Sequence, residues 1–140
     1  MKCALLLLLA WAAPVQAQHY PAQPIRLIAP APPGSPVDIR ARWVAEHLAP
    51  ALGQPVVVDN RPGAGGNLGA DAVARSVPDG HTLLVAHQGI LTINPHLYAR
   101  TGFDALKDFA PITRLVDTAL LLAVPSGSRI HSMDELVHAA

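Results

Sequence analysis

The strongest constraint on the fold is the segment Val56–Asp71, where a run of three valines leads into a glycine-rich turn and then into a short apolar helix. Val56–Val58 is β-branched throughout, which predicts a buried strand, and Leu68–Ser76 predicts a helix. The four glycines between Pro62 and Ala70 let backbone N–H groups approach one another or a ligand, because no Cβ stands in the way. Open α/β sheets bind anions at such turns, since unpaired N–H groups and the helix dipole point outward there. The segment therefore indicates an α/β protein that binds an anion at this turn, either as a ligand or as the substrate of a reaction.

The first 17 residues have the pattern of a secretory signal peptide. Lys2 supplies a positive charge, Ala4–Ala13 is the apolar stretch, and small residues precede a cut before Gln18. The apolar stretch is too short for a membrane span. The single cysteine, Cys3, lies in this leader, so the mature chain has neither a disulfide nor a thiolate metal site. We therefore expect a soluble, exported protein that begins at Gln18.

The charge balance argues against a nucleic-acid partner. Ten Lys and Arg residues equal ten Asp and Glu residues, and no basic patch of the kind that nucleic acid requires is present. An apolar content of 51% with few aromatic residues is typical of a globular α/β domain. His81 and His87 are six residues apart, His131 and His138 are seven apart, and no His-Glu-x-x-His occurs. We therefore predict neither a metal nor a cofactor.

Strands and helices alternate along the chain. Ser35 followed by Pro36, with an acid at Asp38, marks a helix start, and Gly53 marks its end. The predicted strands cover 25–29, 56–58 and 82–86; the predicted helices cover 36–52 and 68–76, with a short turn or helix at 94–98 and a helix from 133; residues 109–116 and 119–124 are predicted to be extended. This order implies a parallel sheet with helices on its faces.

The two longer predicted helices each have an apolar stripe and a charged outer face. On the outer faces, Arg42 with Glu46 and Asp71 with Arg75 have the i,i+4 spacing of ion pairs. The residues expected to face inward are Val37, Ala41, Val44, Leu48 and Ala51 in the first helix and Leu68, Ala72, Val73 and Val77 in the second.

The loops that follow parallel strands emerge at the same edge of the sheet. Here those loops are Pro30–Ser35, Asn60–Asn67 and His87–Asn94. We therefore expect a binding site where the three loops converge.

Nucleotide binding is not predicted at this edge. Gly63 and Gly65 have the first spacing of a dinucleotide motif, but Leu68 stands where its last glycine belongs, and no Gly-Lys-Ser/Thr is present. The alternative interpretation of these glycines is a tight turn with close packing of helix on strand.

No catalytic group is recognisable either. Ser35 lacks the Gly-x-Ser-x-Gly setting of a nucleophile, Asp38 is interpreted as a capping acid, and no pair of carboxylates is arranged for acid–base work. Arg61 has two open interpretations, an anion-binding side chain or a solvated one. His87 is either a binding residue or an ordinary polar residue of its loop.

The ordered motifs resemble those of the Bug-type substrate-binding receptors of tripartite tricarboxylate transporters. The block Asn60–Gly69, Asn-Arg-Pro-Gly-Ala-Gly-Gly-Asn-Leu-Gly, is the most specific of them. The others are Tyr20-Pro21 with Pro24-Ile25, Pro33–Asp38, Gly53–Val58, Pro78–Leu83, Asn94-Pro95 and Leu106–Pro111. Together they span the whole mature chain in order.

This resemblance implies a two-lobed periplasmic binding protein of the Venus flytrap type, monomeric and not an enzyme. Such a receptor closes on a small organic carboxylate and passes it to membrane permease subunits. Family members are longer than this chain, and the last helix has no stop signal before Ala140. The resemblance thus implies a truncated N-terminal fragment, with lobe one at 18–117 and the start of lobe two at 118–140.

The resemblance also implies which residues bind the ligand. They are Pro33, Gly34 and Ser35 after the first strand, His87, Gln88 and Gly89 after the third, and Gly66 and Asn67 as a wall of the cleft. Ser35 departs from the family's second glycine, and Ala31 stands in place of an aromatic residue. His87 and Gln88 replace smaller hydroxyl residues and add hydrogen-bonding groups.

Two other functions remain open from the sequence. One is a secreted α/β enzyme that acts on an anionic substrate at the same edge. The other is a truncated product without function.

Overall fold

The computed structural model describes residues 19–119 and 121–139, and these divide into two units between Ala110 and Pro111. The predicted leader, residues 1–17, lies outside the described residues. Among the residues described, no helix is long and apolar enough to cross a membrane.

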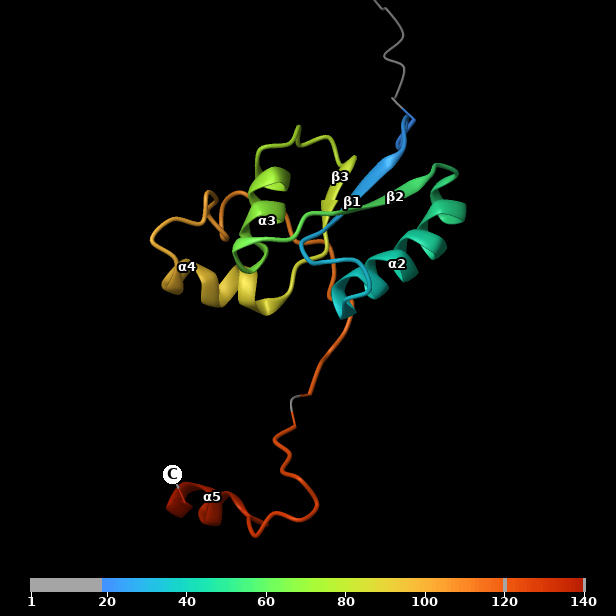
Figure 1. Ribbon diagram of the computed structural model, residues 1–140. Helices are drawn as coiled ribbons and strands as arrows, with labels where there is room; N and C mark the ends of the chain where they lie inside the picture. Colours follow the sequence, from blue (N-terminus) through green and yellow to red (C-terminus); the bar gives the residue numbers. More distant parts are fainter. Residues whose placement is uncertain (1–18, 120, 140) are drawn as a thin grey trace, which may run out of the picture. The chain divides into compact units, whose positions relative to one another are not determined.

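The first unit is built on a three-stranded parallel sheet, as predicted (Figure 1). Its strands are β1 (Ile25–Ala29), β2 (Val56–Asn60) and β3 (Thr82–Leu84), in the order β2-β1-β3. The first strand has the predicted bounds and the second is two residues longer. The third is two residues shorter, because it pairs only with Arg26–Ile28 of β1.

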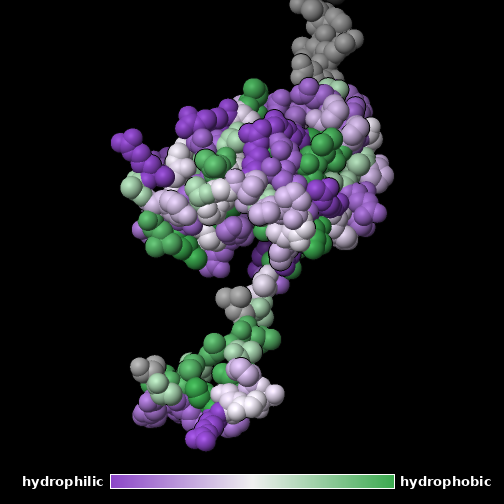
Figure 2. Space-filling model, in the orientation of Figure 1, coloured by the Kyte–Doolittle hydropathy of each residue, from purple (hydrophilic) through white to green (hydrophobic). Residues whose placement is uncertain are grey.

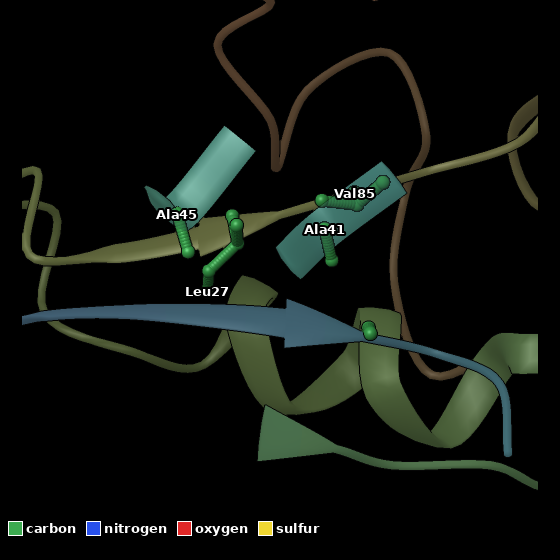
Figure 3. Close-up of a cluster of buried hydrophobic side chains, with 5 residues drawn as sticks. Leu27, Ala41, Ala45 and Val85 are labelled. Carbon is green, nitrogen blue, oxygen red and sulfur yellow. The ribbon is translucent and has the colours of Figure 1, made fainter. Parts of the chain in front are cut away.

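Helix α2 (Pro36–Leu52) covers one face of the sheet, with the predicted start and end. Gly53 adopts the left-handed conformation, with φ 66°, and its N–H donates to Ala49 O over 3.0 Å, which closes the helix. Figure 3 shows the core under this helix, where Leu27, Ala41, Ala45 and Val85 gather between α2 and the sheet. Ala51, predicted to face inward, is exposed in the last turn.

Helix α3 (Asn67–Ala74) packs on β1 and β3. It begins one residue earlier than predicted and ends two residues earlier, so Val77 lies beyond the helix and is exposed rather than inward-facing. Leu68 is also exposed, because Ala70 and Gly69 are the residues that turn toward the sheet.

The segment after β3 is helical. The sequence predicted a loop for residues 87–94, which is wrong for 89–93, and a short turn or helix at 94–98, which is confirmed. The segment consists of a π-helical turn, η3 (Gly89–Ile93), followed by α4 (Asn94–Leu97). Ile90 of η3 is fully buried and packs close to Gly66. This turn places the Ile90 side chain inside the first unit.

The second unit contains one helix in the residues described, α5 (Met133–Ala139). It begins as predicted, with Ser132 as its capping residue, whose Oγ accepts a hydrogen bond from Glu135 N over 3.2 Å. The sequence predicted extended segments at 109–116 and 119–124, and no strand forms in the described residues of either segment. Large apolar side chains of this unit are exposed, such as Leu121 and Leu122, and Figure 2 shows the unit's chain bearing many hydrophobic residues.

Candidate functional site

The three loops that follow the strands contact one another at one edge of the sheet, as the topology predicted. Asn60, at the end of β2, donates from Nδ2 to Ala31 O in the first loop over 3.1 Å. Gly69 of α3 approaches Pro30, at the start of that loop. Asn94, after the third strand, donates from Nδ2 to Gly65 O in the second loop over 3.0 Å.

The first loop is organised by the buried carboxylate of Asp38. Its Oδ2 accepts hydrogen bonds from Gly34 N at 2.8 Å and Arg42 Nε at 3.0 Å, and its Oδ1 accepts from Asn60 Nδ2 at 2.8 Å. Asp38 is 2% exposed. The sequence predicts Ser35 as the helix cap and Asp38 as a capping acid. Ser35 Oγ accepts from Asp38 N over 3.3 Å, and the Asp38 carboxylate accepts from Gly34 N just before the helix. The carboxylate does more than cap the helix, because it ties the loop, α2 and β2 together.

These contacts also set the charge state of Asp38. The Arg42 side chain, the Gly34 N–H and the Asn60 amide, in that order, lower the pKa of the Asp38 carboxyl from 3.8 to about 2. The predicted pair of Arg42 with Glu46 is wrong, since Arg42 bonds instead to Asp38 and, from Nη2, to Asn60 Oδ1 at 3.2 Å. The second predicted pair is confirmed, with Arg75 Nε 2.9 Å from Asp71 Oδ1.

The predicted ligand residues of the first loop use some of their donors internally. Gly34 gives its N–H to Asp38, and Ser35 N donates to Pro32 O over 3.2 Å. Pro33 and Gly34 are exposed, and Ser35 is half-buried at the start of α2. The side of this loop that faces solvent is therefore formed by Pro33 and Gly34, while its N–H groups hold the turn.

Arg61 is held by a carboxylate of its own chain. Its Nε lies 3.1 Å from Asp59 Oδ2, and the same oxygen accepts from Arg26 Nε at 2.9 Å. Burial raises the pKa of the Asp59 carboxyl, but the two arginines outweigh burial and the pKa is lowered overall. The Arg61 side chain is still 41% exposed, and the ion pair uses its Nε, so both interpretations of Arg61 stay open.

The glycines of the second loop permit close packing against the third. A Cβ on Gly66, whose φ is 94°, would lie 2.6 Å from Ile90 Cδ1. A Cβ on Gly65 would lie 2.9 Å from the Tyr98 hydroxyl. The turn is therefore a docking surface for η3 and α4, which supports the tight-packing interpretation of the glycines over a phosphate cradle.

The second and third loops are also joined by a pair of side-chain amides. Asn94 Nδ2 donates to Asn67 Oδ1 over 2.7 Å, and both residues are buried. Asn67 Nδ2 is buried and has no hydrogen-bond partner in the part of the chain that the structure describes. The predicted wall residues Gly66 and Asn67 are thus brought together with Asn94, which the sequence did not single out for the site.

The predicted residues of the third loop lie at the start of η3. His87 and Gln88 are exposed, and Gly89 is half-buried. The backbone oxygen of Gln88 accepts a hydrogen bond from Thr92 Oγ1 over 2.9 Å, within the π-helical turn. Within residues 19–119, no hydrogen bond joins these three residues to Pro33–Ser35, so the two predicted ligand loops are not linked directly.

One surface groove reaches this edge at Asn60, and a second, smaller hollow lies away from it. The groove, of about 470 Å³, is lined by Pro24, by Ile25 and Arg26 of β1, and by Val57–Asn60 of β2. A smaller one of about 250 Å³ is lined by residues between His19 and Gln23, with Asp79 and His81. Neither is lined by a predicted ligand residue, and the described residues contain no cluster of three or more metal-ligating side chains.

Asn60 and Asn94 are the residues at this edge that sequence reasoning missed. Asn60 ends β2 and Asn94 begins α4. In the sequence both were interpreted only as parts of motifs. For Asn60, the position in the sequence was the signal that could have found it. An amide at the carboxyl end of a parallel strand lies beside the neighbouring loops.

Comparison with known proteins identifies the class. Residues 40–140 match the family model described as the tripartite tricarboxylate transporter family receptor. The chain therefore belongs to this receptor family, a family of solute-binding proteins, and its resemblance to Bug-type receptors is confirmed. A relative, a UPF0065 protein of Bordetella bronchiseptica, is 46% identical over 134 residues. The protein BugT of Bordetella pertussis is 42% identical over 127 residues.

Solved structures agree with the observed fold. The structure titled periplasmic binding protein BugD is 43% identical, with a TM-score of 0.63 over 66% of this chain and 31% of that chain. R. palustris Rpa4515 with adipate is 30% identical, with a TM-score of 0.68 over 86% of this chain and 40% of that chain. These likenesses confirm a periplasmic-binding-protein fold. The match to the Bordetella bronchiseptica relative covers 95% of this chain but 40% of that relative's length, and the match to BugT covers 90% and 39%.

Proposed function

We propose that this chain is the N-terminal part of a periplasmic receptor that captures a small organic carboxylate for a tripartite tricarboxylate-type transporter. The observation that carries this proposal is the match of residues 40–140 to the receptor family. The related structure with adipate supports a carboxylate as the ligand class. The convergence of three loops at one sheet edge is consistent with that role.

We propose that the ligand lies at this edge and is bound without chemistry. The exposed imidazole of His87 and the amide of Gln88 would donate hydrogen bonds to it, beside Gly89. Pro33, Gly34 and Ser35 would form the opposite side, and Gly66 and Asn67 the wall between them. Hydrogen bonds to an ionised carboxylate are shorter and stronger than those between neutral groups, so a few such donors suffice to hold a small acid.

The proposal also covers the location of the whole receptor, its oligomeric state and its division into two lobes. Export through the leader 1–17 would place it in the periplasm, as a monomer that meets membrane permease subunits. Lobe one would comprise residues 18–117, and lobe two would begin at 118 and continue beyond this chain. Because the relatives are longer than the matched region, the second lobe would supply the other half of the ligand contacts.

Isothermal titration tests the proposal. It uses the natural-length protein, which here means this chain extended to the length of the relatives it matches. Adipate, succinate, citrate and glutamate should be tried, and at least one should bind with measurable heat. Adipamide is a matched control, because it keeps the carbon chain of adipate and lacks both negative charges. Absence of heat with every acid, or equal binding of adipate and adipamide, would contradict carboxylate recognition.

A further inference from the structure

The direction of the Asn67 amide is fixed by a backbone carbonyl. Gly65 O can only accept a hydrogen bond, so Asn94 must turn its Nδ2 toward it, at 3.0 Å. The same Nδ2 donates to Asn67 at 2.7 Å, so Asn67 must present its Oδ1 there. The Nδ2 of Asn67 consequently points away from Asn94 and cannot exchange places with the oxygen.

This Nδ2 has no acceptor in the described part of the chain. Asn67 is 3% exposed, and its Nδ2 is buried without a hydrogen-bond partner among residues 19–119 and 121–139. Native proteins pair nearly all buried polar groups, and a donor that stays unpaired loses its hydration without compensation. An acceptor from outside the described residues would remove that penalty.

The surroundings of Asn67 favour an anion as this acceptor. Asn67 is the first residue of α3, and the preceding Gly66 provides no side-chain cap. The Asn67 N–H itself donates to Ala64 O, and the positive end of the helix dipole lies beside the Asn67 side chain. An anionic acceptor interacts favourably with both the Asn67 Nδ2 and this helix dipole.

We propose that Asn67 Nδ2 donates to a carboxylate oxygen of the bound ligand, and that Asn94 is the positioning residue that aims it. This inference rests on the proposed function and adds to it a specific donor and the residue behind that donor. Since Nδ2 is closed off from solvent, the carboxylate reaches it through a local shift of the neighbouring η3. A π-helical turn is suited to such a shift, because these turns recur at functional sites and interrupt regular helical bonding.

Titration of adipate into the natural-length protein and its variants tests the inference. Asn67→Leu keeps the size of the side chain and removes the donor, and should weaken adipate binding about tenfold or more. Asn94→Leu leaves the Asn67 amide free to turn, and should weaken binding in the same direction. Ser76→Ala is the matched control: it removes a hydrogen bond at the other end of α3, Ser76 Oγ to Val73 O at 2.7 Å, and should leave the affinity unchanged.

A spectroscopic measurement covers the case in which Asn67→Leu does not fold. In ¹⁵N-labelled wild-type protein, the assigned side-chain NH₂ signal of Asn67 should shift downfield when adipate is added. No shift, or an unchanged affinity of a folded Asn67→Leu, would overturn the inference while leaving carboxylate binding intact. A wild-type protein that binds none of the acids would instead refute the proposed function, and this inference with it.

Discussion

Asp38 is the single residue on which the shape of the first loop most depends. Its carboxylate accepts hydrogen bonds from Gly34, Arg42 and Asn60, which belong to a loop, a helix and a strand. The three partners all favour the ionised form, so protonation of Asp38 weakens the contacts that hold this loop.

Acid should therefore loosen this loop over a defined pH range. The pKa of Asp38 is lowered from 3.8 to about 2 in the folded protein. A lowered pKa contributes stability that is present above the ordinary value and is lost as pH falls through the folded value. Thermal unfolding of the natural-length protein should thus show the melting temperature falling between about pH 4 and pH 2. A flat profile over this range would contradict the ion network.

The variant Asp38→Asn tests whether Asp38 causes this loss of stability in acid. Asparagine keeps the shape and still accepts a hydrogen bond, but it loses the charge that holds Arg42. The variant should be less stable than the wild type at pH 7, and its stability should fall less steeply between about pH 4 and pH 2, which urea unfolding at each pH measures. Equal slopes for the two proteins would show that other carboxylates dominate.

At the scale of elements, the contact between the glycine-rich turn and η3 should tolerate no side chain. Gly66→Ala forces a residue with Cβ into a left-handed conformation and against Ile90. The strain amounts to about 1–2 kcal/mol, and overpacking adds about 1–3 kcal/mol. We expect a loss of roughly 2–5 kcal/mol in the free energy of unfolding, measured with urea.

Gly53→Ala is the control for that substitution. Gly53 also has a positive φ, 66°, but a Cβ there meets nothing within 4 Å. It should cost only the backbone strain, about 1–2 kcal/mol. If both variants lose the same stability, the approach of Ile90 to Gly66 does not matter.

Elements with signals at both ends were predictable from the sequence. Helix α2 has Ser35 and Pro36 at its start and Gly53 at its end, and its predicted bounds are those observed. The π-helical turn was missed because local sequence does not reveal that Ile90 will be buried beside Gly66. Strands were not observed at 109–119 and 121–124, since a strand requires a neighbour with which to pair.

The candidate site was predictable in position but not in its bonding. Parallel topology alone placed the three loops at one edge. Spacing could not tell whether Arg42 pairs with Asp38 or Glu46, because each is four residues away. Asn60, which comes from another element, settles that choice by joining Asp38 and Arg42. For the same reason the Asn67–Asn94 pair, 27 residues apart in sequence, could not be foreseen.

At the scale of the whole molecule, ligand binding should require more chain than the 140 residues. A receptor that closes on its ligand uses two lobes, and the matched region is 40% of the length of the Bordetella bronchiseptica relative. Residues 18–140 alone should bind adipate weakly or not at all by isothermal titration, whereas the natural-length protein should bind it. Micromolar affinity of the short chain would contradict this prediction.

The segment that follows Ala110 should be the part of this polypeptide that proteases cut first. Residues 111–119 and 121–132 contain no helix or strand, and the side chain of Arg114 is 78% exposed. Arg42, in contrast, lies within helix α2 of the folded first unit, where its backbone is held in helical hydrogen bonds. Brief treatment of the 140-residue chain with trypsin should therefore cut after Arg114 early and leave the three-stranded unit as the longer-lived product.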